Sequence, residues 1–305
     1  MTTTSNSAIA PATRRQIMMG SSFLLSAAVL WGVGFYAQRV SVEETTPLWA
    51  VALRFGLAVP LALGAWAWRR AQGIRIPWRA GAVLGVLLYL VFALQTVALV
   101  HTSVSRVALI TALYSVFVPV LQPLFGLPRP RLLQLVAVGI GLLSLVLLCG
   151  VIGDQASLAT PPNVGDFYTL IMAVIAAVLV LLIAHFAPRE DTIALNAVQI
   201  MTMATCAFVI APLLEGPPPT HIGTPTFFSL VYLAVASTFL AFWFQMLGQR
   251  HVSPSTASIL MMVETPIGVV AAVVILHEAM ADFQWAGAFL ALVAVAVAVA
   301  AEKPA

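Results

Sequence analysis

Residues 92–105 read FALQTVALVHTSVS, and residues 242–255 read FWFQMLGQRHVSPS. Five of the fourteen positions are identical: one Phe, one Gln, one His and two Ser recur at an offset of 150 residues (242 − 92). Apolar segments share a small set of residue types and often match by chance, but polar residues such as Gln and His are rare in them. A second match, AAVL at 27–30 and at 176–179, has an offset of 149 (176 − 27). The sequence therefore predicts a duplicated unit.

The composition is that of a chain surrounded by lipid. Hydrophobic residues make up 61% of it and charged residues 8%, whereas a soluble domain has about 25% charged residues. A bilayer core about 30 Å thick requires about 20 mostly apolar residues per helix. Runs of that length recur along the chain, and they are continuous rather than alternating, which disfavours a β-barrel. We therefore predict an all-α membrane protein.

Ten transmembrane helices are predicted, and a polar linker at 153–165 separates the fifth from the sixth. The expected spans are 17–37, 48–68, 80–100, 106–125, 132–152, 167–186, 193–214, 226–248, 254–276 and 283–301. This division gives two five-helix repeats, one in residues 1–155 and one in residues 156–305. Because five is odd, the second repeat must cross the membrane in the opposite sense. Inverted repeats of this kind are typical of secondary transporters, which bind solutes near the bilayer midplane.

The basic residues predict the orientation. With the amino terminus in the cytoplasm, eleven Arg and Lys residues lie on cytoplasmic segments, and only Arg39 and Arg106 lie outside. This bias follows the positive-inside rule and places both termini in the cytoplasm. It also explains the net charge of +3 without a nucleic-acid partner.

Several short motifs resemble those of one transporter superfamily. They are Leu30-Trp31-Gly32 with Phe35, Pro47 with Arg54-Phe55, His101 to Ser105, Val252 to Ser255, Glu264 with Pro266, and His277-Glu278. On these residues the chain resembles the drug/metabolite transporter superfamily, EamA type. The resemblance covers nearly the whole chain and implies a ten-helix carrier of small solutes in the inner membrane. In size and pattern the chain is also similar to YddG-type amino-acid exporters.

Glu264 is the acidic residue expected near the bilayer midplane, about ten residues into its span, or roughly 15 Å at 1.5 Å per residue. Two interpretations stay open. Its carboxyl group binds a substrate amine or carries a proton, or it bonds to backbone groups released by Pro266. The 150-residue offset pairs Glu264 with Tyr114. An acid and a phenol at matching depth suit a zwitterionic or amphipathic solute.

Arg54 lies one to two turns inside the second span. We expect its side chain to snorkel to the outer interface or to pair with Glu43 or Glu44, in preference to contacting a substrate carboxylate. A coupling role for Arg54 is the alternative.

The other candidate cavity residues are amides and aromatic residues inside the spans. Gln95 and Gln245 are favoured as contacts between helices, with substrate binding as the alternative. Trp31, Tyr89 and Trp243 lie away from the interfaces, where aromatic residues line an apolar cavity or simply pack.

The sequence contains no nucleotide-binding loop, zinc-protease motif or paired intramembrane aspartates, so we expect neither an enzyme nor a cofactor or metal site. The favoured function is export of neutral or aromatic amino acids by a monomeric carrier, with protons as a potential coupling ion. The alternative is a nucleotide-sugar or phosphate-ester carrier of the same superfamily, ahead of a membrane-embedded enzyme or a scaffold. Such anionic solutes require several basic residues in the spans, and only Arg54 is present there.

Overall fold

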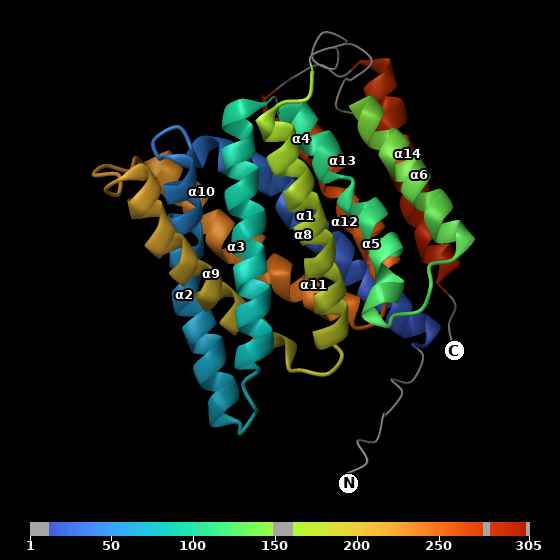
Figure 1. Ribbon diagram of the computed structural model, residues 1–305, viewed down its shortest axis with the longest axis horizontal. Helices are drawn as coiled ribbons and strands as arrows, with labels where there is room; N and C mark the ends of the chain where they lie inside the picture. The colour runs from blue at the N-terminus through green and yellow to red at the C-terminus, as the bar shows by residue number, and fades with distance from the viewer. Residues whose placement is uncertain (1–11, 103, 149–160, 277–280, 303–305) are drawn as a thin grey trace.

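The computed structural model describes residues 12–102, 104–148, 161–276 and 281–302, and every regular element in these ranges is a helix (Figure 1). In chain order they are α1 (Arg14–Ser41), α2 (Pro47–Ala71), α3 (Trp78–His101), α4 (Val104–Thr111), α5 (Tyr114–Leu121), η1 (Gln122–Phe125), α6 (Leu132–Leu148), α8 (Val164–Phe186), α9 (Thr192–Glu215), α10 (Thr224–Ala234), η2 (Val235–Leu240), α11 (Ala241–Gln249), α12 (Pro254–Met262), α13 (Glu264–Leu276) and α14 (Asp282–Ala301).

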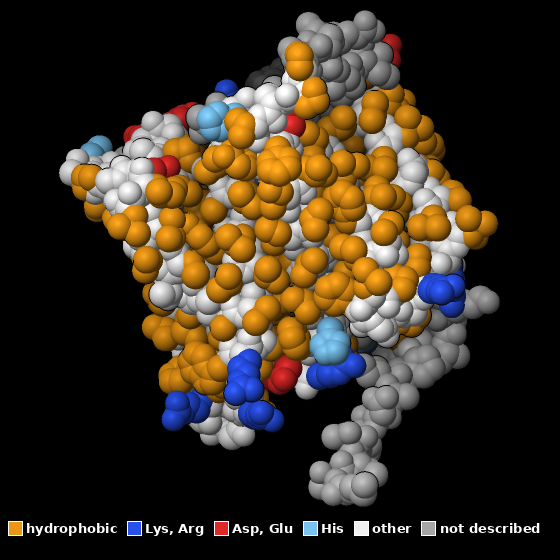
Figure 2. Space-filling view, viewed as in Figure 1, with side chains coloured by type: hydrophobic (Ala, Val, Ile, Leu, Met, Phe, Trp, Pro, Cys, Tyr) orange, Lys and Arg blue, Asp and Glu red, His pale blue; other side chains and the backbone are white. Residues whose placement is uncertain are grey.

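Every predicted span coincides with helix in the described ranges. In the described ranges, eight helical stretches are long and apolar enough to cross a bilayer, and α6 is a shorter apolar helix of 17 residues. The remaining span, the ninth in chain order, consists of α12 and α13 together. Figure 2 shows a broad hydrophobic belt with most of the visible Lys and Arg side chains near one edge. The prediction of an all-α membrane protein is confirmed.

The packing of the helices follows the predicted duplication. α3 lies against α8 and α9, and its counterpart α10 lies against α1 and α2. The pairs α2 with α9 and α6 with α14 each join equivalent helices of the two halves. Equivalent helices run in opposite directions (Figure 1). The two halves are therefore inverted copies of one five-helix unit, although the predicted boundary at 155 and 156 lies outside the described residues.

A helix-capping arrangement repeats at the same offset. Thr13 caps α1, with its hydroxyl accepting from the Gln16 N–H and its own N–H donating to the Gln16 side chain. Asn163 and Asp166, each 150 residues later, form the same capping box at the start of α8. Such boxes satisfy backbone N–H groups that have no partner within the helix. Side chains of different types thus perform the same task in both copies.

The fourth and ninth spans are interrupted, which the sequence analysis did not predict. α5 begins at Tyr114 and α13 begins at Glu264, again 150 residues apart. In the ninth span, Pro266 has no N–H to donate to the Met262 carbonyl. In the fourth, the Ser115 hydroxyl and N–H both donate to the Ala112 carbonyl, which tightens the turn there. Each interruption leaves irregular backbone near the middle of its span.

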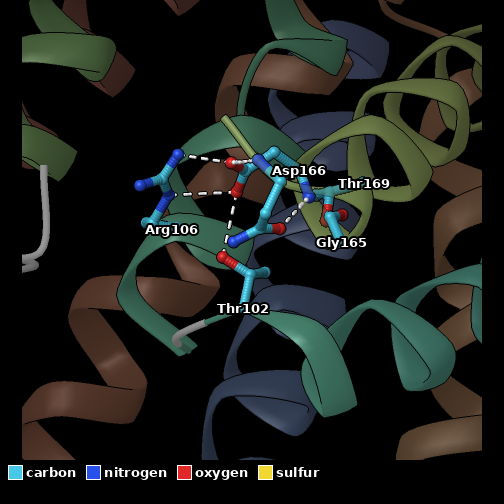
Figure 3. Close-up of polar contacts among 6 residues, drawn as sticks. Thr102, Arg106, Gly165, Asp166 and Thr169 are labelled. Carbon is cyan, nitrogen blue, oxygen red and sulfur yellow. Dashed lines mark hydrogen bonds and ion pairs between the residues drawn. The ribbon is translucent and has the colours of Figure 1, made fainter. Parts of the chain in front are cut away.

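Asp166 also connects the two halves (Figure 3). Its Oδ1 accepts from Thr102 Oγ1 at 2.9 Å and from Arg106 Nε at 3.0 Å, and its Oδ2 forms an ion pair with Arg106 Nη2. One carboxylate therefore holds the end of α3 and the first turn of α4 against the start of α8.

Close helix packing leads to a stability prediction. A Cβ atom on Gly85 would lie 2.6 Å from the backbone oxygen of Gln199, so Gly85→Ala must move α3 away from α9. We expect it to lower the free energy of unfolding by about 1–3 kcal/mol, as is typical of overpacking. Gly64→Ala is the matched control, because a Cβ there has no neighbour within 4 Å. Thermal unfolding of the purified variants in detergent checks this, and equal midpoints for both would contradict the packing.

Candidate functional site

A cavity of about 170 Å³ lies between the two halves, lined by residues of both. Its polar wall residues are Gln38, Arg54, Gln95, Thr111, Tyr114, Ser237, Gln245 and Glu264, and its main apolar ones are Trp31, Phe35, Phe92, Phe242, Met172 and Met261. The cavity thus combines an aromatic wall with a few polar groups, which is the usual character of a small-molecule site.

The helix interruptions place Tyr114 and Glu264 on this cavity. The Tyr114 hydroxyl donates to the Ser258 carbonyl at 3.0 Å and thereby connects α5 to α12. Among the described residues, no hydrogen bond or ion pair involves the Glu264 carboxyl group. The alternative in which Glu264 bonds to backbone released by Pro266 is therefore not seen.

Arg54 does not snorkel, contrary to the favoured expectation. Its side chain is buried, its guanidinium donates to residues of the π-helical turn η2, and the rings of Phe92 and Phe55 lie 5.0 and 5.4 Å from it. Pairing with Glu43 or Glu44 is also wrong, because no ion pair in the described part of the chain involves Arg54, and the Glu44 carboxylate accepts from the Gly223 N–H at 2.7 Å. This hydrogen bond lowers the pKa of Glu44. Internal acceptors on η2 hold Arg54 in the interior of the helix bundle, and snorkelling would break three hydrogen bonds.

The two repeated amides line the cavity from opposite halves. Gln95 extends from α3 and Gln245 from α11, and in the described part of the chain neither amide is hydrogen-bonded to a neighbouring helix. The preferred prediction, that they connect helices, is not seen. Both amides are instead available to a bound solute.

The predicted aromatic residues separate into two groups. Trp31 lines the cavity, and its Nε1 donates to the Ser237 carbonyl at 2.9 Å. Tyr89 does not line it, since the cavity residues of α3 are Leu88, Val91, Phe92 and Gln95 and Tyr89 points about 100° away from Leu88 into the apolar core. Trp243 is also outside it and borders a separate groove between α2 and α11, where its Nε1 donates to Thr192 Oγ1 at 3.3 Å. Their assignment as cavity residues is corrected accordingly.

Sequence reasoning missed the polar pair Ser237–Thr238, which holds Arg54. Two hydroxyl residues in the middle of an otherwise apolar span were the available signal, because polar groups at that depth need a partner. Gln38 was also missed, and it lies where the cavity meets a second hollow.

This second hollow, the vestibule, has a volume of about 230 Å³ and shares Gln38, Arg54 and Phe92 with the cavity. It extends to Val42 and Pro47, where α1 ends and α2 begins. On the side of the cavity away from the vestibule, the space between the helices is filled by side chains without solvent exposure. These include Leu84, Ile183, Leu195 and Met246. The cavity is therefore approached from the face that carries the α1–α2 connection.

Comparison with known proteins decides the family. The EamA-like transporter family matches residues 18–150 and 163–300, which together cover most of the chain.

The chain belongs to the EamA-like transporter family.

An uncharacterized transporter of Archaeoglobus fulgidus is 23% identical over 279 residues, covering 88% of this chain and 82% of that protein. A protein of known crystal structure superimposes with a TM-score of 0.80 over 93% of this chain and 97% of its own, at 19% identity. This second likeness concerns the fold alone. As an EamA-like protein the chain is a multi-pass membrane transporter of small molecules and not an enzyme, which confirms the resemblance found in the sequence.

The vestibule makes a prediction about accessibility. Thr96 lines the vestibule, and Met246, 150 residues later, is fully buried. With Cys149 and Cys206 replaced by Ser, we expect a polar maleimide to label Thr96→Cys and to leave Met246→Cys unlabelled. Mass spectrometry of the labelled protein measures this. Equal labelling at both positions would show that the second end is not closed.

Proposed function

We propose that this EamA-like protein exports small amphipathic metabolites, chiefly neutral or aromatic amino acids, across the inner membrane by alternating access. One observation carries the proposal. Arg54 and Glu264 line the same aromatic cavity, and no direct ion pair joins them in the described structure. A zwitterion brings one group of each charge into such a space, and so it compensates both the buried Arg54 and the half-buried Glu264.

The charge of the cavity argues against nucleotide sugars and phosphate esters. Arg54 is the only basic wall residue among the described residues, and Glu264 repels a strongly anionic solute. Phosphate groups are generally held by several basic side chains or helix N-termini. A neutral or zwitterionic solute therefore fits better.

The remaining parts of the proposal concern the setting. The basic residues near one edge of the hydrophobic belt support an orientation with both termini in the cytoplasm. The described residues of one chain line the cavity from both halves, which supports a monomer. Glu264 is the proposed coupling residue, because a carboxyl group without a hydrogen-bond partner in a low-dielectric cavity can take up and release a proton.

Uptake into proteoliposomes tests the function. Labelled amino acids are screened with and without a pH gradient, and we expect uptake of aromatic or other neutral amino acids above protein-free liposomes. Absence of uptake of all amino acids would overturn the proposal.

Glu264→Gln tests the coupling. It removes the ionisable group while keeping the shape of the side chain, so we expect flux to lose its dependence on the pH gradient. Glu190→Gln, on the connection between α8 and α9, is the control and should keep wild-type behaviour. Unchanged flux with unchanged pH dependence in Glu264→Gln would refute a coupling role.

A further inference from the structure

We propose that the Nη1 group of Arg54 is a carboxylate-binding subsite, and that the π-helical turn η2 positions it through Ser237 and Thr238. The proposal rests on the proposed function, since it assigns the end of the cavity that takes the acidic group of the solute.

The π-helical turn frees a carbonyl group in the middle of the membrane. The N–H of Ala241 donates to the carbonyls of Ala236 and Thr238 and passes over that of Ser237, four residues back. The Ser237 carbonyl instead accepts from Arg54 Nη2 at 3.0 Å and from Trp31 Nε1 at 2.9 Å. One displaced carbonyl therefore fixes both a cation and an aromatic wall of the cavity. Turns of this kind occur often at functional sites.

The hydrogen bonds of Arg54 use one edge of the guanidinium. Its Nε donates to Thr238 Oγ1 at 2.8 Å, and its Nη2 donates to the carbonyl and hydroxyl oxygens of Ser237, both at 3.0 Å. A guanidinium has five N–H donors, so the two on Nη1 are left without an acceptor among the described residues. Nη1 is absent from the fully buried side-chain atoms that lack a partner, so these donors are accessible from the space that Arg54 lines. An anionic group of the solute supplies the missing acceptor.

The position of Arg54 makes this edge reachable. The side chain lines both the vestibule and the central cavity, although only 4% of its surface is exposed. The rings of Phe92 and Phe55 flank the guanidinium at 5.0 and 5.4 Å and limit its movement. A solute that enters through the vestibule therefore meets a cation that is already oriented.

The chemical class of the ligand follows from the charges around it. A carboxylate carries one negative charge and planar oxygen acceptors, which match a guanidinium. A phosphate ester brings more negative charge into a cavity that already contains Glu264. The solute is thus held with its carboxylate at Arg54, its amino group toward Glu264 and its apolar part against Trp31 and Phe242.

Three probes separate the two ends of the solute: L-phenylalanine, L-phenylalaninamide without the carboxylate, and 3-phenylpropanoate without the amino group. Their affinity for the purified full chain in detergent is measured by isothermal titration calorimetry. Removal of a charge-assisted hydrogen bond typically weakens binding by about tenfold or more. We expect Arg54→Lys to lower the affinity for L-phenylalanine and for 3-phenylpropanoate by about that factor. The affinity for L-phenylalaninamide should stay unchanged.

Thr238 provides a variant that leaves the charge in place. Thr238→Val keeps the shape of the side chain and removes the acceptor for Arg54 Nε. We therefore expect the affinity for the two carboxylate probes to fall by about three- to tenfold, and the affinity for L-phenylalaninamide to stay the same. Thr238→Ser restores the hydroxyl group and should bind all probes as the wild type does. Thermal unfolding midpoints establish that each variant is folded.

The outcomes separate this subsite from the proposed function. The subsite would be overturned if each variant lowered the affinity for all three probes equally, or if neither variant changed the affinity for L-phenylalanine. Either result would leave the proposed function standing. Arg54-dependent binding of 3-phenylpropanoate without binding of any amino acid would support the subsite and contradict the function.

Discussion

The hydrocarbon core of a bilayer offers no hydrogen-bond partner, and the rest of this structure depends on that constraint. Backbone groups without a partner cost several kcal/mol each in lipid, so the chain is helical wherever it crosses. Irregular backbone is tolerated at that depth only where protein covers it or where it lines a cavity. The interruptions at Tyr114 and Glu264 and the π-helical turn η2 are all on the wall of the central cavity. The departures from regular helix are thus concentrated at the site.

Duplication explains how the cavity is built, and divergence explains its chemistry. Phe92 and Gln95 line the cavity from the first half, and Phe242 and Gln245 line it from the second. At the helix interruptions the copies differ, because Tyr114 of the first half carries a phenol where Glu264 of the second half carries a carboxyl group. Arg54 adds a cation from the first half alone. An inverted scaffold therefore encloses a cavity whose wall carries one basic and one acidic side chain.

Much of the architecture could be predicted from the sequence, because its signals are local. Apolar run length located the helices, and the 150-residue offset between Gln95 and Gln245 revealed the inverted halves. It also directed attention to Tyr114 and Glu264. The direction of side chains could not be predicted in this way: Tyr89 and Trp243 are as deep as the cavity residues but lie on other faces of their helices. The partner of Arg54 was missed because Thr238 is 184 residues away in the chain.

The central claim is that one cavity, with Arg54 and Glu264 both on its wall, holds a zwitterionic solute. A structure determined by electron cryo-microscopy with L-phenylalanine bound tests it most directly. The account predicts density for the amino acid in the cavity, with its carboxylate within hydrogen-bond distance of Arg54 Nη1 and its amino group facing Glu264. Solute density outside the cavity, together with a Glu264 carboxyl group bonded to the backbone near Pro266, would contradict it.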